Sequence, residues 1–350
     1  MNSKIFVTDS EIREDTGGGI VSKNLLVALN NLDSIKSVVI DRKSVDCDLN
    51  SQPFNPFLLD YFSSKRVPFG LYKLALFYGA PFAETAHRIK LFSPTVTTIA
   101  DVAPHNIDES SLEHKNHGIL FNYPHLVNQH LWNLYCLHIT QADKIVVHSK
   151  KSVDYLSAKA NASRDKFVVI PHGCYVPFGF TEYPVDFTVG HLGSNGMDKG
   201  QVYFVKAISE VAKTNKPFSA IIAGIGTEYW KSYGGVGWVK DETEVFKACT
   251  VYIQPSITEG FGIPALTAMA YKRPVIVSSG AGVSELVKDG YNGFIVEPRN
   301  VRAISDYIIY FMDNPSEIKR MGENAYSTSL KWTWDVVNRE YVKLFRSLVP

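Results

Sequence analysis

The chain has 350 residues, of which 45% are hydrophobic and 20% are charged, and its formal net charge is +1. This length exceeds what one ordinary domain needs and suits two domains, each with its own core. The near-zero net charge gives no electrostatic reason to expect a nucleic-acid partner.

The cysteines and histidines are not spaced as metal ligands. The four cysteines are far apart and form no CxxC pair: Cys47, Cys136, Cys174 and Cys249. Neither of the two closest histidine pairs has helical i,i+4 spacing with a third ligand in view. We therefore predict no metal site, and reduced thiols as in a cytosolic protein.

Hydropathy favours a protein without a membrane span. The first residues lead directly into a short apolar strand, without the apolar stretch of a signal peptide. No run approaches the roughly 18 apolar residues of a spanning helix. We expect a cytoplasmic protein, with peripheral attachment to a membrane surface as the alternative.

The first half alternates short apolar strands with helices, which is typical of α/β domains with parallel sheets. The predicted strands lie at 5–7, 38–40, 95–99, 145–147 and 167–170. Gly17, Gly18 and Gly19 precede a segment at 20–29 whose apolar residues have helical spacing. A second helix is predicted at 126–139.

Residues 64–78 mix three basic residues with many bulky apolar ones. We interpret this segment as a core helix of the first domain with a solvated basic edge, because the basic residues are too few to define a face. The alternative is an interfacial helix that rests on anionic lipid.

Residues 171–184 interrupt the pattern with three prolines and two glycines, and we interpret them as a linker. A second α/β series follows. Its predicted strands lie at 188–189, 219–223, 251–254, 275–277 and 294–296. Its predicted helices lie at 202–212 and 264–271, and a final helix is predicted at 335–348.

The segment after the strand at 251–254 has the features of an anion-binding turn. A loop from Pro255 to Gly262 leads to Pro264, which begins a helix where its missing N–H costs nothing. In an open α/β sheet, ligands bind beyond the carboxyl ends of the strands, where the first N–H groups of such a helix face. Glu259 could accept hydrogen bonds from sugar hydroxyls. Glu259 could equally be a surface carboxylate, and the glycines could serve only the geometry of the turn. This segment alone therefore leaves open whether it binds a ligand.

Together with its flanking segments, this region resembles the donor-site signature of the retaining glycosyltransferases of family 4. The resemblance follows the family's order and spacing through segments at 255–270, 273–277, 284–287 and 289–296. Upstream, Gly193 to Gly200, which contains Lys199, is similar to that family's first nucleotide-binding loop. The resemblance covers about half of the chain, nearly all of it in the second domain.

The resemblance implies a GT-B fold, in which two Rossmann-like domains face each other across a cleft. It implies an acceptor-binding domain at 1–172, a donor-binding domain at 185–330, and a helix at 331–350 that crosses back to the first domain. It further implies a hexosyltransferase that uses a UDP- or GDP-linked sugar, with retention of anomeric configuration and without a metal. The nucleotide-sugar is then a co-substrate, no other cofactor is expected, and the acceptor is a glycan, a lipid-linked molecule or another compound.

Carried over by position, the family's site residues fall on both halves of the chain. Glu259 would contact the donor sugar, and Lys199 would neutralise the diphosphate, where a leaving group gains negative charge. Asp101 is the third candidate catalytic residue. The other predicted donor contacts are Ser194, Gly260, Phe261, Gly262, Ile263, Leu266 and Thr267, with the amides near the last two at the phosphates. Gly17, Gly18 and Gly19 would form a loop that admits acceptor or donor phosphate.

The chain departs from the family pattern at three positions. Thr267 stands where the family has a second glutamate that holds the ribose, and Ser194 stands where it has an arginine. Ala100 stands where the first domain has a histidine before Asp101, although His105 is close enough in sequence to replace it. A hydroxyl can make one or two hydrogen bonds to a ribose but cannot act as a charged bidentate acceptor.

These departures leave a non-catalytic protein of the same fold, which binds sugars or nucleotide-sugars, as the main alternative. A sugar-nucleotide epimerase has the same architecture but lacks support in the first domain. A dinucleotide oxidoreductase is disfavoured because the three glycines at 17–19 do not form GxGxxG. We predict an active transferase, because Glu259, Lys199 and the turn at 260–264 are all present. His172 and His191 are further candidates for lining the cleft.

Overall fold

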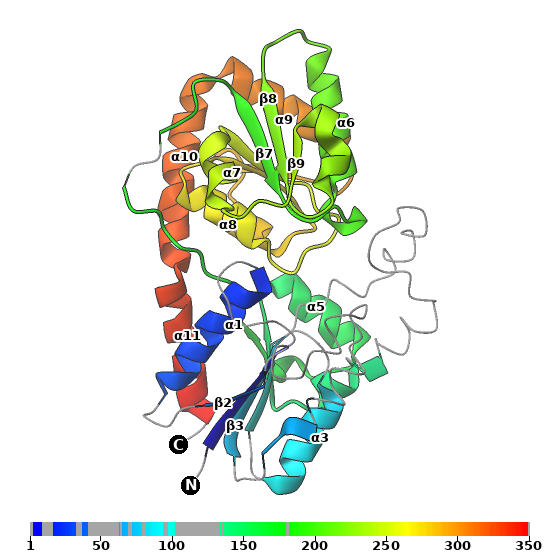
Figure 1. Ribbon diagram of the computed structural model, residues 1–350, viewed down its shortest axis with the longest axis vertical. Coiled ribbons are helices and arrows are strands. Elements are labelled where there is room, and N and C mark those ends of the chain that lie inside the picture. The colour runs from blue at the N-terminus through cyan, green and yellow to red at the C-terminus, as the bar shows by residue number, and fades with distance from the viewer. Residues whose placement is uncertain are drawn as a thin grey trace. The chain divides into compact units, whose positions relative to one another are not determined.

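The computed structural model describes most of the chain, in these segments: 3–8, 17–32, 37–40, 63, 65–68, 72–78, 82–93, 97–101, 133–134, 136–179 and 182–348. The described residues form two compact units (Figure 1). The first unit contains those up to Pro171 together with those from Asp335 onward, and the second runs from His172 to Trp334.

The first unit is built on a parallel sheet of six strands, in the order β2-β1-β3-β4-β5-β6. The strands are β1 (Ser3–Thr8), β2 (Val38–Ile40), β3 (Tyr72–Tyr78), β4 (Thr97–Asp101), β5 (Lys144–Val147) and β6 (Phe167–Val169). Helices α1 (Gly17–Asn30), α3 (Ala83–Phe92) and α5 (Lys150–Lys159) belong to this unit, as does the 3-10 turn η4 (Arg164–Lys166). Ala86 and Ile89 of α3 pack against Phe77 of β3, which forms part of the core of this unit.

The helix that we predicted at 64–78 is wrong for its second half, because Tyr72–Tyr78 is strand β3, between β1 and β4. Most of its side chains are buried, including Leu74, Ala75, Leu76 and Phe77. A parallel strand covered on both faces is nearly continuously apolar, so it lacks the alternation that separates a strand from a buried helix. The lipid-facing alternative does not fit these buried residues either. Of the helix predicted at 126–139, residues 126–132 lie outside the described residues, and helix is present at 133–134 and 136–141.

The second unit has its own parallel sheet of six strands, in the order β12-β11-β10-β7-β8-β9. The strands are β7 (Thr188–Leu192), β8 (Ser219–Ala223), β9 (Gly235–Gly237), β10 (Val251–Gln254), β11 (Val275–Ser278) and β12 (Gly293–Val296). The predicted strands at 219–223 and 251–254 are confirmed to the residue. The short edge strand β9 was not predicted, because two of its three residues are glycine.

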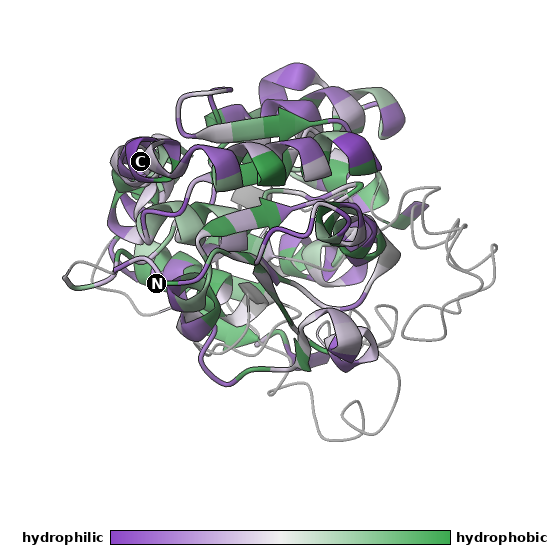
Figure 2. Ribbon diagram, turned by 90° about the horizontal axis from the view of Figure 1, so that it is seen from above, coloured by the Kyte–Doolittle hydropathy of each residue, from purple (hydrophilic) through white to green (hydrophobic). Residues whose placement is uncertain are grey.

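Helices cover both faces of this second sheet. They are α6 (Gln201–Ala212), α7 (Thr243–Ala248), α8 (Ile263–Ala270), α9 (Val301–Asp313) and α10 (Pro315–Ser329), with 3-10 segments η5 (Met197–Lys199), η6 (Thr227–Tyr233), η7 (Gly282–Leu286) and η8 (Leu330–Trp332). Tyr252 of β10 packs with α8 on one face, whereas its neighbours Val251 and Ile253 pack with α6 and α9 on the other. The strands visible in Figure 2 are largely hydrophobic, as burial on both faces requires.

Helix α11 (Trp334–Leu348) ends the described chain. Its buried residues Val337, Tyr341 and Phe345 recur every four positions, which places them on one side of the helix. The side chain of Asn338 donates to Asn24 of α1 at 3.3 Å. None of the described helices is both long enough and apolar enough to cross a bilayer.

Arg273 is the largest fully buried side chain among the described residues. Its Nε donates to the carbonyl of Phe246 at 2.8 Å, and its Nη2 donates to those of Glu182 at 2.8 Å and Lys247 at 3.3 Å. The guanidinium also lies 4.7 Å from the ring centroid of Tyr183. Arg273 therefore joins the carboxyl end of α7 to the chain that precedes β7.

Replacing Arg273 with leucine should lower the free energy of unfolding by about 3 kcal/mol, because it leaves buried carbonyls without a donor. Urea denaturation followed by tryptophan fluorescence measures the change. The matched control is Arg302→Leu, whose side chain is 89% exposed and should cost less than about 0.5 kcal/mol. Equal losses in the two variants would contradict this role of Arg273.

Candidate functional site

The candidate site lies where the loops after β7 and β10 meet. These two parallel strands are neighbours in the sheet, with Val251 beside Val189 and Tyr252 beside Gly190. The strand order reverses between them, and ligands of doubly wound sheets bind beyond the carboxyl ends at such a point. The carbonyl of Asp198 in the first loop accepts from the amide of Ile257 in the second at 2.7 Å.

Gly200 allows the close approach of these loops. Its φ is +73°, and a Cβ at this position would collide with the carbonyl oxygen of Pro255. Only glycine combines this left-handed conformation with so little room. Gly200 also precedes α6, so the loop, the helix start and Pro255 are fixed together.

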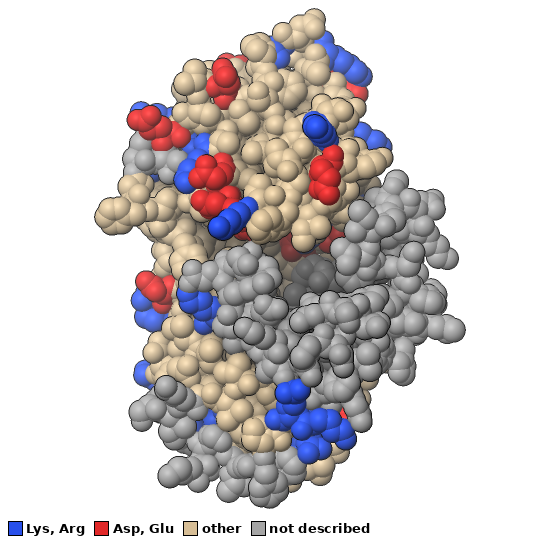
Figure 3. Space-filling view, viewed as in Figure 1, with Lys and Arg blue, Asp and Glu red and all other residues tan. Residues whose placement is uncertain are grey.

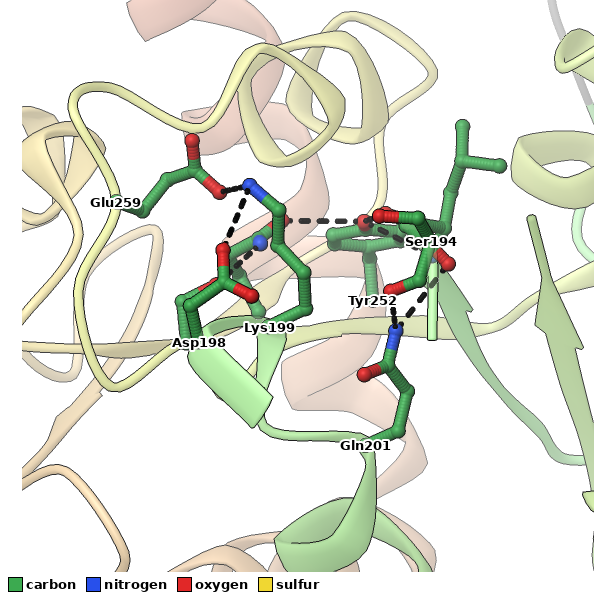
Figure 4. Close-up of polar contacts among 10 residues, drawn as sticks. Ser194, Asp198, Lys199, Gln201, Tyr252 and Glu259 are labelled. Carbon is green, nitrogen blue, oxygen red and sulfur yellow. Dashed lines mark hydrogen bonds and ion pairs between the residues drawn. The ribbon is translucent and has the colours of Figure 1, made fainter. Parts of the chain in front are cut away.

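Lys199 and Glu259 form an ion pair between the two loops (Figure 4). Their side chains are 22% and 14% exposed, and Asp198 Oδ2 lies 3.7 Å from Lys199 Nζ. Burial alone would lower the pKa of Lys199, but Glu259 and Asp198 outweigh it and hold this pKa above its ordinary value. The ammonium therefore remains charged at neutral pH.

The turn before α8 supplies backbone donors next to this ion pair. Gly262 has a φ of +103° and precedes the helix, which has proline in its first turn. The carbonyls of Glu259 and Phe261 accept from the amides of Gly282 at 3.0 Å and Val283 at 2.6 Å. Within the described segments, no carbonyl or side chain accepts from the amides at 260–263. The N–H groups of Gly262 and Ile263 lie at the start of α8, a position suited to an anion, and those of Gly260 and Phe261 precede it in the turn.

The predicted phosphate contacts near Leu266 and Thr267 lie one turn farther along α8. The amide of Leu266 donates to the carbonyl of Gly262 at 3.4 Å, and the Thr267 hydroxyl donates to the carbonyl of Ile263 at 3.0 Å. This leaves Thr267 only its lone pairs for a ligand. The amide of Leu266 is thus engaged within the chain, in contrast to the amides at 260–263.

The ring of Phe261, which belongs to this turn, packs against the ring of His172. Phe261 is 3% exposed, and its ring packs edge-on against His172 with centroids 5.7 Å apart. His172 also lies 6.1 Å from the ring of Trp334. Phe261 can therefore offer its backbone to a ligand, whereas its side chain belongs to the core.

A buried polar network fixes the carboxyl ends of β7 and β10. The Tyr252 hydroxyl accepts from the amide of Leu192 at 3.1 Å and lies 3.2 Å from Gln254 Oε1, to which it can donate. Gln254 Nε2 donates to the hydroxyl of Ser256 at 2.8 Å. Sequence reasoning gave these residues no role, although polar side chains at every second position of a buried strand were the available signal.

Gln201 holds the first loop from the start of α6. Its Nε2 donates to the carbonyls of Gly193 at 3.2 Å and Ser194 at 2.5 Å (Figure 4). Ser194 itself is exposed, and its backbone rather than its hydroxyl is held. Gln201 was also missed in the sequence, where it lies between Lys199-Gly200 and the helix predicted at 202–212.

His191 lies fully buried beneath these loops. Its Nδ1 lies 2.9 Å from the carbonyl of Ile253, so Nδ1 carries the proton and donates. Burial lowers the pKa of His191 to about 4, and the ring packs near Phe204. Both His191 and His172 are buried, so the structure gives neither the exposed position expected of a cleft-lining residue.

The predicted residues of the first half belong to the first unit. Asp101 is the last residue of β4, and Gly17, Gly18 and Gly19 form the first turn of α1 rather than a loop before it. His105 and Cys47 lie outside the described residues. Among the residues that the structure describes, no group of three or more His, Cys, Asp and Glu could hold a metal ion.

Charges of both signs are interspersed on the surface of the second unit. Figure 3 shows lysines and arginines beside aspartates and glutamates over the face of the second unit that it presents. Among the described residues of this unit, Lys213 pairs with Glu210 at the end of α6 at 2.7 Å, and Lys247 pairs with Glu244 on α7 at 2.6 Å.

Comparison with known proteins identifies relatives of the second unit. Residues 180–328 match the family model described as Glycosyl transferases group 1, and they include both loops of the site. The chain is 27% identical over 206 residues to an uncharacterized glycosyltransferase of Methanocaldococcus jannaschii, covering 56% of this chain and 57% of that protein. It thus spans little more than half the length of this relative. These matches support a glycosyltransferase of group 1.

Two solved structures extend the similarity to both units. Sucrose-phosphate synthase from Thermosynechococcus elongatus superimposes with a TM-score of 0.73 at 15% identity, covering 99% of both chains. Anabaena HepE in complex with UDP-glucose gives a TM-score of 0.67 at 17% identity, covering 98% of this chain and 99% of that one. At these identities the likeness concerns the fold. The predicted GT-B fold with two Rossmann-like domains is confirmed, whereas family 4 and retention stay predictions.

The buried imidazole of His191 predicts a pH dependence of stability. Its pKa of about 4 in the folded chain lies below the ordinary 6.5 of the unfolded chain, so the unfolded chain binds a proton first as pH falls. Stability should therefore fall between about pH 6.5 and pH 4, at up to about 1.4 kcal/mol per pH unit from this residue.

His191→Asn keeps a donor near the position of Nδ1 but cannot titrate, so it should remove that part of the pH dependence. Thermal unfolding of both proteins across this pH range measures the difference. His87→Asn, at an exposed position on α3, serves as the control and should keep the slope of the wild type. If stability fell with pH equally steeply in His191→Asn and in the wild type, the His191 imidazole would not be buried in its neutral form as described.

Proposed function

We propose that the protein is a glycosyltransferase that takes a sugar from a UDP- or GDP-linked donor, with the donor held by the loops after β7 and β10. The observation that carries this proposal is the Lys199–Glu259 pair beside the amides at 260–263. A diphosphate requires positive charge and N–H donors, and a sugar requires an acceptor for its hydroxyls. This point of the sheet offers all three.

Each group has a separate role in the proposed reaction. Lys199 and the amides at 260–263 bind the diphosphate and stabilise the charge that grows on it as the bond to the sugar breaks. Glu259 accepts hydrogen bonds from the donor sugar. The match of residues 180–328 to group 1 glycosyltransferases supports this assignment, because it contains all of these residues.

Retention of configuration, a hexosyl donor and independence of metal complete the proposal. They rest on the resemblance to family 4, in which the departing phosphate helps to deprotonate the acceptor. In this chain the diphosphate would be held by one lysine and several amides, since Ser194 replaces an arginine. Thr267 would offer the ribose only the lone pairs of its hydroxyl.

The acceptor is assigned to the first unit, with a glycan or lipid-linked molecule as the proposed class. Asp101 and the first turn of α1, which contains Gly17, Gly18 and Gly19, are its candidate contacts. Each follows or ends a parallel strand, and the carboxyl ends of such strands are where ligands bind. The UDP-glucose bound to Anabaena HepE supports a UDP-linked donor as the first to test.

Lys199→Met should lower kcat/KM for the preferred donor about 100-fold, because it removes the cation at the leaving group. The measurement is mass-spectrometric detection of transfer and donor hydrolysis with a panel of UDP- and GDP-sugars, supported by titration calorimetry. Lys213→Met, in an exposed ion pair at 2.7 Å beyond the end of α6, is the control and should keep full activity.

Three results would change the proposal. Unchanged activity in Lys199→Met would remove this lysine from the site. Binding of nucleotide-sugars without transfer or hydrolysis would favour the non-catalytic binding protein. No binding of any nucleotide-sugar at millimolar concentration would rule out the donor site.

A further inference from the structure

Lys199 and Glu259, the two charged residues that we propose bind the donor, form an ion pair with each other. Lys199 Nζ contacts Glu259 Oε2 directly, while the Asp198 carboxylate stands off at 3.7 Å. A diphosphate that binds Lys199 must therefore compete with the Glu259 carboxylate for the same ammonium. The competition is between two anions, which also repel each other once they are close.

The backbone on both sides of this pair is held, so the competition concerns side chains. The amide of Glu259 donates to the carbonyl of Gly280 at 3.1 Å, and its carbonyl accepts from Gly282 at 3.0 Å. The amide of Lys199 donates to the carbonyl of Gly196 at 3.1 Å. The exchange that we infer therefore involves the side chains rather than the backbone of either loop.

Low exposure makes the exchange costly for a ligand that offers Glu259 nothing in return. The Glu259 side chain is 14% exposed, so water can compensate only in part for the loss of the contact with Lys199. A carboxylate that loses its cation in such a place and faces a diphosphate is destabilised. Sugar hydroxyls that donate to it would offset this loss.

The local charge strengthens the effect. Asp198, Lys199 and Glu259 together carry a formal charge of −1, and Ser194 supplies no second cation where the family has an arginine. With one ammonium shared among these anions, each carboxylate has a large influence on how a further anion binds.

We propose that the Lys199–Glu259 ion pair makes the site discriminate between a nucleotide-sugar and the nucleoside diphosphate that remains after transfer. This inference rests on the proposed function. When a nucleotide-sugar separates the pair, its diphosphate binds Lys199 and its sugar hydroxyls donate hydrogen bonds to Glu259. The nucleoside diphosphate satisfies Lys199 alone, and the return of Glu259 to Lys199 then favours its release.

The test compares the affinities of UDP and UDP-glucose, and of GDP and GDP-mannose, by titration calorimetry. In Glu259→Gln the nucleoside diphosphate should bind about tenfold more tightly than in the wild type, because a neutral amide no longer competes for Lys199. The nucleotide-sugar should bind no more tightly than before. The preference for the nucleotide-sugar should therefore fall at least about tenfold.

Asp198→Asn is the matched control. It removes one negative charge near the Lys199 ammonium, as Glu259→Gln does, but it keeps the direct contact between Lys199 and Glu259. Any gain should be below about threefold and equal for both ligands, which leaves the preference unchanged. In a Lys199→Met background, Glu259→Gln should no longer tighten nucleoside diphosphate by more than about threefold. This double variant also covers the case in which either single variant folds poorly.

Each outcome has a defined meaning. The discrimination is overturned, and the proposed function is not, if nucleotides bind but Glu259→Gln keeps the wild-type preference for the nucleotide-sugar. The same holds if Asp198→Asn changes this preference as much as Glu259→Gln does. A full effect of Glu259→Gln in the Lys199→Met background overturns it as well. Absence of nucleotide binding in the wild type and in every variant overturns the proposed function and the discrimination together.

Discussion

The site depends on the pairing of β7 with β10 as neighbouring parallel strands. The helix that follows β7, α6, packs on one face of the sheet, and α8, which follows β10, packs on the other. The chain therefore leaves these two strands toward opposite faces of the sheet, and the two loops meet beyond the strand ends, where Lys199 and Glu259 pair. Gly190 shows how tight this arrangement is, because a Cβ there would lie 2.6 Å from Cβ of Cys249.

Much of the second unit could be predicted from sequence, because its strands are β-branched runs between glycines and prolines. The start of α8 could be predicted to within one residue, because proline is favoured in the first turn of a helix and Pro264 lies there. Strand β3 could not, since its burial depends on partners that are far away in sequence. The alternation of polar side chains marked Gln254 as unusual, but its partner and those of Gln201 depend on which carbonyls and hydroxyls the folded chain brings within reach. The family resemblance supplied Lys199 and Glu259 as site residues but not the bond between them.

In the proposed donor site, backbone N–H groups are more numerous than unopposed positive charges. One lysine lies between two carboxylates, whereas the amides at 260–263 carry no formal charge and do not titrate. Donors of this kind are set by the fold, through Gly262 and the supporting amides of Gly282 and Val283. The serine at position 194, where the resemblance implies an arginine, is thus compatible with the proposed anion binding, and under our proposal it increases the influence of Glu259.

The most direct measurement is a crystal structure of the protein with a bound nucleotide-sugar. Our account predicts the diphosphate within hydrogen-bond distance of Lys199 Nζ and the amides at 260–263, with Glu259 turned from Lys199 to the sugar. It would be contradicted by a nucleotide that binds elsewhere. One such place is the cavity of about 460 Å³ at the amino ends of the strands, lined in part by Tyr183, Phe187 and Phe311.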